Sequence, residues 1–279
     1  TFRIGGPADF FCIVENEEEL LQALDFAKKK KAPFFILGGG SNILISDEGF
    51  RGLVIKMEIK GIEFSDLVDG DGQTRVIAKA GENWDDFVKE TVKKGLYGLE
   101  NLSLIPGTVG AVPVQNIGAY GSEVKDTIDF VRVFDTKENI FKDLSNFDCH
   151  FRYRNSIFKE KIVERKDKHK REENGTKKCR YIITSVVFIL KKNGKVNIEY
   201  KDVKEYFSSR NITHPSLEDV RKAVIEIRMN KLPDVKVVGT AGSFFKNPSI
   251  SHLQARELKI KYPDLPVYPI DDEFVKISL

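Results

Sequence analysis

Hydrophobic and polar positions along the chain change between two patterns, one typical of short strands and one typical of amphipathic helices. Apolar runs predict buried strands at residues 10–14 and 34–37, and between them residues 17–31 carry apolar side chains at helical spacing. The same reasoning predicts further strands at 53–57, 62–64, 75–80, 127–134 and 181–190, and helices that begin at Trp84 and cover 202–209 and 216–230. Short strands with occasional helices indicate an α+β fold rather than a doubly wound parallel sheet.

Charged and capping residues mark the ends of two of these helices. Glutamates 17–19 open the first helix and lysines 28–31 close it, which is the order that the helix dipole favours. Ser216 precedes the last helix and Asp219 stands three residues later, at the capping-box position. These signals predict where both helices begin.

Residues 101–121, here called the central stretch, break both patterns. The stretch holds four of the 21 glycines and no charged residue, although 31% of the chain is charged. Pro106 and Pro113 exclude a continuous helix or a central strand. Buried irregular backbone must satisfy its N–H and C=O groups, and a planar ligand rich in donors and acceptors is one partner for them. Packing of a Gly/Pro loop beneath a sheet is the alternative.

Three glycines follow the strand predicted at 34–37. Residues 38–42, Gly-Gly-Gly-Ser-Asn, are here called the glycine loop. Backbone N–H groups at such a position can cradle an anion such as pyrophosphate, and a tight hairpin is the alternative. The loop matches neither the Rossmann fingerprint nor a P-loop, because no G-x-G-x-x-G opens a helix and no Gly-Lys-Ser/Thr follows.

Composition narrows the class of protein. The 279 residues carry a net charge of +3, with a mean hydropathy of −0.30 and no apolar run long enough for a transmembrane helix. Nearly balanced charge gives no reason to expect a nucleic-acid partner, and the basic segment 164–180 lacks interleaved aromatic residues. Three distant cysteines form neither a disulfide framework nor a metal-ligand spacing. We therefore expect a cytoplasmic protein without a metal site.

Two further segments carry candidate chemistry. Tyr153 and Arg154 lie in a cationic segment that could meet an anionic substrate through an Arg fork, or be an ordinary surface loop. Ser243 stands between small residues and two phenylalanines, where it could be a proton donor or only a turn residue. No G-x-S-x-G elbow surrounds it, so it is a poor candidate nucleophile.

Several of these segments occur in one order along the chain and together carry a resemblance to a known family. They are residues 1–8, 37–42, 80–84, 98–111, 113–121, 151–159 and 242–248. In this set and order the chain resembles the MurB family of UDP-N-acetylenolpyruvoylglucosamine reductases over nearly its whole length. The Tyr153-Arg154 segment is similar to the type I branch, in which a tyrosine loop folds over the substrate.

The resemblance implies a fold and a division into domains. It implies a two-part FAD-binding domain of the vanillyl-alcohol-oxidase/PCMH kind at 1–192, with a subdomain boundary near 50–55. A smaller α+β substrate domain would follow at 193–279 and would be truncated. We expect a monomer that binds FAD without a covalent bond.

The resemblance also assigns cofactor-binding positions. The glycine loop would hold the FAD pyrophosphate through Gly38, Gly39, Gly40, Ser41 and Asn42. The flavin would be lined by Ile105, Pro106, Gly107, Gln115, Asn116, Gly118 and Ala119.

The implied reaction uses two small molecules in one site, in turn. NADPH would reduce FAD, and hydride would then pass to the enolpyruvyl double bond of a UDP-sugar. Ser243 matches the family's proton donor to the resulting carbanion, a base strong enough to accept from a hydroxyl, and Arg154 matches the cation that stabilises its charge. The substrate would be gripped by Tyr153, Tyr200, Arg228, Lys231 and Asn247.

One departure from the family keeps two alternatives open. The family's catalytic Glu lies beyond a segment that would begin where this chain stops, at 274–279, so we expect a piece of a longer chain that binds FAD but turns over poorly. A non-catalytic flavin-binding relative is therefore one alternative. A flavin oxidase of the same fold is the other, although it predicts a covalent His or Cys near the glycine loop and none lies in 36–46.

Overall fold

The computed structural model describes residues 4–67, 72–159, 179–235, 237–242, 245–270 and 272–277. The chain forms two compact units, Thr1–Thr240 and Ala241–Leu279, and each is described by itself.

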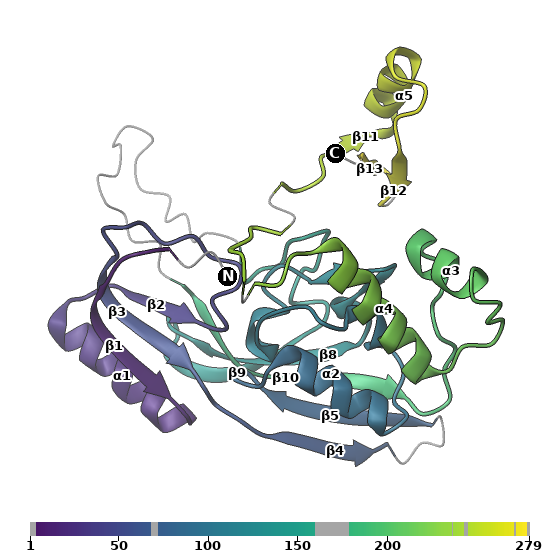
Figure 1. Ribbon diagram of the computed structural model, residues 1–279. Coiled ribbons are helices and arrows are strands. Elements are labelled where there is room, and N and C mark those ends of the chain that lie inside the picture. The colour runs from purple at the N-terminus through teal and green to yellow at the C-terminus, as the bar shows by residue number, and fades with distance from the viewer. Residues whose placement is uncertain are drawn as a thin grey trace. The chain divides into compact units, whose positions relative to one another are not determined.

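The first unit opens with a small parallel sheet (Figure 1). Its strands are β1 (Ala8–Val14), β2 (Phe34–Leu37) and β3 (Phe50–Met57), in the order β1-β3-β2. Helix α1 (Glu17–Lys30) begins at Asn16, whose side chain accepts from the Glu19 N–H, and packs Leu20, Ala23 and Ala27 on the sheet. The predicted strand, helix and strand are thus confirmed.

β3 is the central strand of the small sheet. It pairs with both β1 and β2, so the small sheet continues to Met57. The subdomain boundary expected near 50–55 falls within this strand, and the division of the first unit into two subdomains stays a prediction. The run of apolar residues in β3 suits a strand that is covered on both sides.

A larger antiparallel sheet forms the rest of the framework. It contains β4 (Ile62–Asp66), β5 (Gln73–Lys79), β8 (Ile128–Asp135), β9 (Ile140–Ser145) and β10 (Tyr181–Lys191), in the order β4-β5-β10-β8-β9. β10 is central and almost wholly buried, as its apolar sequence predicts. β9 was not predicted, because an edge strand with few buried side chains gives no clear apolar alternation.

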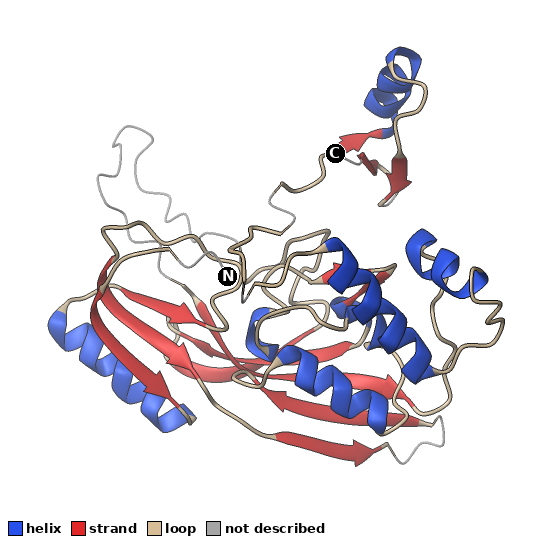
Figure 2. Ribbon diagram, in the orientation of Figure 1, coloured by secondary structure: helices blue, strands red, loops and turns tan. Residues whose placement is uncertain are grey.

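Three helices accompany this sheet, α2 (Trp84–Lys93), α3 (Lys201–Ser208) and α4 (Leu217–Lys231) (Figure 2). The apolar face of α2 reaches β10 through Phe87, whose ring centroid lies 5.1 Å from that of Phe188. The predicted capping box of α4 is present, with Asp219 N–H donating to Ser216 Oγ. Helices α2 and α4 also contact residues 100–102, at the start of the central stretch.

Five short elements lie in the otherwise irregular region between α2 and β8. They are η1 (Glu100–Leu102), η2 (Val109–Ala111), β6 (Gly118–Ala119), β7 (Ser122–Glu123) and η3 (Val124–Asp126). Leu102, Val109, Val112 and Ile117 from the central stretch join the main core, so the stretch is buried within the fold.

The expected domain boundary after residue 192 falls inside the first unit. A change of character does occur there, because α3 and α4 form a second hydrophobic cluster of Val203, Phe207, Val220, Ala223, Val224 and Ile227. Nevertheless α4 is tied to α2, since Arg221 forms an ion pair with Asp85. Whether residues 193–279 act as a substrate domain stays a prediction.

The second unit is a small antiparallel sheet with one helix. Its elements are β11 (Ser249–Ser251), α5 (His252–Lys261), β12 (Val267–Pro269) and β13 (Phe274–Ile277), with β13 central. Ala255 and Val275 are its buried apolar side chains in the described part. Across the described residues, no helix is both long enough and apolar enough to cross a membrane.

Candidate functional site

The glycine loop leaves the small sheet at the carboxyl end of β2. Ligands of parallel α/β sheets commonly bind at this end of the strands. The Gly38 carbonyl accepts a hydrogen bond from Lys56 Nζ at 2.7 Å, and Gly40 has a φ of +66°, which favours glycine. The backbone of the loop is therefore held in one particular shape.

The glycine loop lies directly against the central stretch, 65 or more residues away in the sequence. Ser41 Oγ donates to the Pro106 carbonyl at 3.0 Å. Asn42 Nδ2 donates to Gln115 Oε1 at 2.9 Å. A Cβ on Gly39 would stand 2.9 Å from the Gly107 Cα, so only glycine permits this approach. The structure thus brings together the two sets of residues predicted to bind the cofactor.

Backbone donors of the glycine loop remain available to a ligand. Within the described residues, no hydrogen bond reaches the N–H groups of Gly39 and Gly40. Adjacent N–H groups in a turn of this kind suit the oxygens of a phosphate. The loop therefore fits the pyrophosphate of a dinucleotide.

The start of α2 anchors the other side of the central stretch. Trp84 donates from its backbone N–H to the Gly107 carbonyl at 3.1 Å, and from its indole N–H to the Leu102 carbonyl at 2.9 Å. Its side chain is fully buried. Trp84 therefore belongs to the core and also sets the position of residues 102–107.

Asn116 and Arg154 arrange the second half of the central stretch. Asn116 is buried and donates to Glu123 Oε2 and the Arg152 carbonyl, while its own oxygen accepts from the Lys125 N–H. Its side chain therefore holds protein segments together. Arg154 donates from Nη2 to the Gly118 carbonyl at 2.6 Å, which places this predicted catalytic cation beside a residue predicted to line the flavin.

The first half of the predicted substrate group gathers around Tyr120. The rings of Tyr120 and Tyr200 meet edge to face at 5.4 Å between centroids. Burial raises the pKa of the Tyr120 phenol, and the nearby charges of Arg228 and Lys231 act in the opposite direction. Lys231 Nζ also donates to Asp202 Oδ2 at 2.6 Å. Two cations and two phenols thus share one region of the first unit.

The remaining predicted residues are divided by the architecture. Tyr153 stands next to Arg154, whose guanidinium lies 5.6 Å from the Tyr153 ring centroid. Asn247 belongs to the second unit, and Ser243 lies outside the described residues. Most of the basic segment 164–180 lies outside them as well. The roles of Arg154, Ser243 and the substrate group stay predictions.

Sequence reasoning missed two residues of this region. Tyr120 lies in the motif at 113–121, but the sequence assigned it no role. The signal that could have found it is its place between Ala119 and Gly121 in an uncharged stretch. Lys56 was hidden in the strand pattern of β3, where a half-buried lysine looks like any outward residue. Its contact with Gly38 could only be read from the fold.

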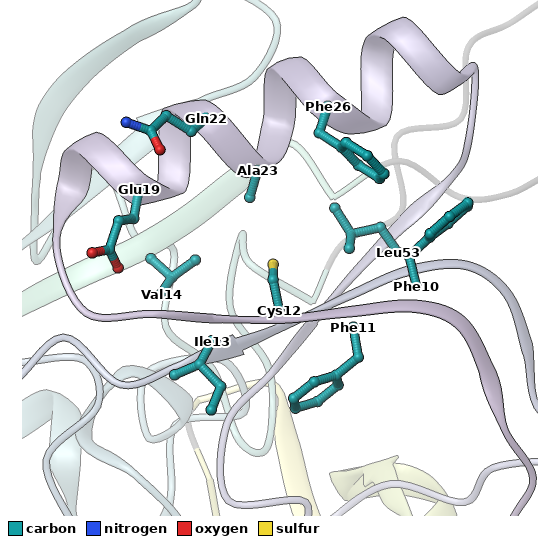
Figure 3. A pocket seen from close by; sticks show the side chains of 10 residues that line it. All are labelled: Phe10, Phe11, Cys12, Ile13, Val14, Glu19, Gln22, Ala23, Phe26 and Leu53. Carbon is teal, nitrogen blue, oxygen red and sulfur yellow. The ribbon is translucent and has the colours of Figure 1, made fainter.

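A separate hollow of about 350 Å³ lies between α1 and β1, away from all predicted site residues (Figure 3). Phe10 and Phe26 face each other across it at 5.2 Å between ring centroids, whereas Phe11 and Ile13 point to the other side of β1. Its lining is mostly apolar and its one charged side chain is the acidic Glu19, which does not suit the diphosphate of a dinucleotide or a UDP-sugar.

Comparison with known proteins agrees with this geometry. Residues 8–142 match the family model described as an FAD binding domain. The chain shares 45% sequence identity with a UDP-N-acetylenolpyruvoylglucosamine reductase of Neisseria gonorrhoeae, in an alignment that covers 100% of this chain and 75% of that protein. It shares 41% identity with the reductase of Flavobacterium johnsoniae, over 99% of this chain and 77% of that protein. The solved reductase MurB of Thermus caldophilus shares 25% identity, with a TM-score of 0.59 over 98% of this chain and 83% of that one. The predicted FAD-binding fold is thereby confirmed.

Proposed function

The chain belongs to the UDP-N-acetylenolpyruvoylglucosamine reductase family, and from this premise we propose that it reduces the enolpyruvyl group of UDP-N-acetylglucosamine enolpyruvate to give UDP-N-acetylmuramate. NADPH is the proposed reductant, and the pathway is peptidoglycan precursor synthesis. We place the enzyme in the cytoplasm as a monomer that needs neither metal nor nucleic acid. The contact of the glycine loop with the central stretch carries the proposal, because it joins both predicted cofactor segments.

FAD would be held without a covalent bond by the backbone of the two segments. The N–H groups of Gly39 and Gly40 would receive the pyrophosphate, and residues 105–107 with 115–119 would line the flavin. Bound FAD would supply the hydride chemistry, which no side chain of the protein can supply. The protein contributes position and charge.

Arg154 would stabilise negative charge that develops on the substrate. Its guanidinium is already held at the Gly118 carbonyl by the 2.6 Å hydrogen bond, so little reorganisation is needed during the reaction. Cation and flavin-lining backbone are therefore in reach of the same ligand atoms. Tyr153 beside it would close over the substrate.

Arg228 and Lys231 would bind the diphosphate of the UDP-sugar, with Tyr200 and Tyr120 against its rings. Arginine binds phosphate through two parallel hydrogen bonds, and lysine adds a point charge. NADPH carries a similar diphosphate, which suits use of one site by the two molecules in turn. Ping-pong kinetics are the expected consequence.

Ser243 would hold the proton that the substrate carbon receives, and Asn247 would contact the substrate. Both roles rest on the sequence motif at 242–248. A serine hydroxyl is a weak acid, so it can donate only to a strongly basic carbanion. Replacement of Ser243 by Ala should therefore lower turnover while FAD binding stays unchanged.

Absorption spectroscopy of the purified chain tests the proposal. Under anaerobic conditions NADPH should bleach the flavin bands, and UDP-N-acetylglucosamine enolpyruvate should restore them. Failure to bind added FAD would overturn the proposal as a whole. A flavin that NADPH bleaches but the UDP-sugar does not restore would retain the FAD site and reject reductase activity of this chain. A flavin reoxidised by oxygen with a small alcohol as donor would favour an oxidase.

A further inference from the structure

We propose that Arg221 is a positioning residue that fixes the flavin-lining loop and the substrate-binding end of α4 in one geometry. The inference rests on the proposed function, because it takes residues 105–107 as flavin-lining and Arg228 and Lys231 as substrate-binding. It adds a residue that no motif marked.

Arg221 joins three segments of the first unit through one guanidinium. Its Nη1 and Nη2 donate to the two carboxylate oxygens of Asp85 at 2.8 and 2.9 Å, and Nη1 also donates to Ser103 Oγ at 2.9 Å. Arg221 is only 8% exposed and Ser103 is fully buried. A planar fork with this pairing holds direction as well as distance. Helix α4 is thereby attached to α2 and to the end of η1.

Asp85 passes this constraint to the flavin-lining loop. The carboxylate oxygen Oδ1 that receives Arg221 Nη1 also accepts the backbone N–H of Leu104. Leu104 has a φ of +58°, a conformation that a leucine seldom adopts without support. Residues 105–107 follow directly, and the Pro106 carbonyl accepts from Ser41 of the glycine loop. The Asp85 carboxylate therefore supports the strained residue at the entry to the proposed flavin site.

The other end of the constraint lies on α4. Arg221 and Arg228 are two helical turns apart and so lie on the same face of the helix. Burial raises the pKa of Asp85, but hydrogen bonds from Arg221 and the Leu104 N–H outweigh it, and the charges of Arg221 and Arg228 add to the lowering. Arg228 is therefore near enough to interact electrostatically with the Asp85 carboxylate. A shift of α4 at Arg221 would displace Arg228 and Lys231 from the flavin.

A second arginine provides a matched control. Arg210 pairs with Glu226 of α4 at 2.9 Å, but both side chains are nearly half exposed and the pair touches neither the central stretch nor α2. It links only the end of α3 to α4. Replacement of Arg210 removes an arginine that pairs with α4, as Arg221 pairs with α2, without releasing Leu104.

The experiment compares Arg221→Met, Arg221→Lys and the control Arg210→Met in the full chain. FAD affinity is measured by flavin fluorescence, and the flavin absorption bands are recorded during titration with UDP-N-acetylglucosamine enolpyruvate. Arg221→Met should weaken FAD binding about tenfold, within the usual range of coupling between sites, and weaken the spectral response to the UDP-sugar. Arg221→Lys should give an FAD affinity and a spectral response between those of Arg221→Met and the parent, because an ammonium cannot reproduce the two-pronged pairing of the guanidinium. Arg210→Met should match the parent chain.

Urea unfolding separates this role from simple loss of stability. All titrations are made where each variant is folded, and if Arg221→Met does not fold, Arg221→Lys carries the decision. Unchanged FAD affinity and an unchanged spectral response in a folded, destabilised Arg221 variant would overturn the inference and leave the proposed function intact. A parent chain that binds no FAD would overturn both the Arg221 inference and the proposed function.

Discussion

The glycine loop and the central stretch are assigned to the same cofactor, but they are built in opposite ways. The glycine loop is short and partly exposed, and within the described residues the N–H groups of Gly39 and Gly40 receive no hydrogen bond. Much of the central stretch is buried, although Pro106, Ala111 and Gly121 are exposed, and side chains such as Trp84 and Asn116 satisfy its backbone and neighbours. The glycine loop therefore has backbone donors left for the proposed ligand, whereas the central stretch is held mainly by contacts within the protein.

This difference separates ligand binding from stability. Substitutions in the central stretch should reduce the free energy of unfolding first, and FAD affinity only as a consequence. Substitutions in the glycine loop should reduce FAD affinity while the protein stays folded. The following variants test that separation.

The largest effect is expected from Asn116→Ala. Alanine removes three hydrogen bonds from a buried site and leaves the Lys125 N–H and the Arg152 carbonyl without this partner. The unfolding free energy should fall by about 3 kcal/mol in urea denaturation, since each unsatisfied buried group costs about 1–3 kcal/mol. Asn139→Ala is the control, because Asn139 also has a positive φ, of +58°, but is exposed. Equal losses in the two variants would refute the scaffold role of Asn116.

A smaller effect, of a different kind, is expected from Gly39→Ala. The new Cβ would stand 2.9 Å from the Gly107 backbone, so the two segments must separate. FAD affinity should fall roughly 30-fold, equivalent to about 2 kcal/mol, because the two cofactor segments are forced apart, and the free energy of unfolding should fall by less. Gly95→Ala should leave FAD binding unaltered, because a Cβ added at Gly95 would meet no heavy atom of the described residues within 4 Å. Loss of stability without loss of FAD affinity would contradict the contrast between the segments.

The smallest effect is expected from Glu100→Gln, at a buried residue directly before the central stretch. Burial raises the pKa of Glu100, although the Gly98 N–H and other backbone donors oppose the change. A carboxyl whose pKa is higher in the folded state destabilises the fold above that pKa, and the penalty disappears as pH falls to the ordinary value of about 4.3. Gln keeps the acceptor for Gly98, so the variant should be more stable than the parent at pH 7.

The difference in unfolding free energy between Glu100→Gln and the parent should shrink as the pH falls towards 4. Urea unfolding of the parent and Glu100→Gln at both pH values measures it. Asp85→Asn is the opposite control, because the pKa of Asp85 is lowered and its stabilisation is lost as pH falls below its ordinary value. A pH-independent advantage of Glu100→Gln would show that burial of charge is not the cause.

Local signals predicted much of the framework correctly. The Ser216–Asp219 capping box and the acidic start of α1 were readable because their partners lie three or four residues away. Strand β10 was readable because nearly all its side chains are buried, Ile189 and the two ends excepted. Strand β9 and the strand order of the small sheet were not, because edge exposure and sheet order depend on distant neighbours.

In the candidate site, too, local motifs predicted the segments but not the contacts between them. Motifs located the glycine loop, the central stretch and Arg154, but no pattern joined Asn42 to Gln115, 73 residues further on. Arg221 looked like any charge on an amphipathic helix, and only its contact with Asp85, 136 residues away, showed that it is buried.

The sequence by itself determined the family, the α+β character and the segments assigned to a cofactor, since these depend on short-range patterns and on residue identity. Only the tertiary structure decided which of those segments touch, which glycines are required by close approach and which charges are buried in pairs. The physical reason is that such contacts arise from packing of segments far apart in the chain, whose partners no local pattern specifies.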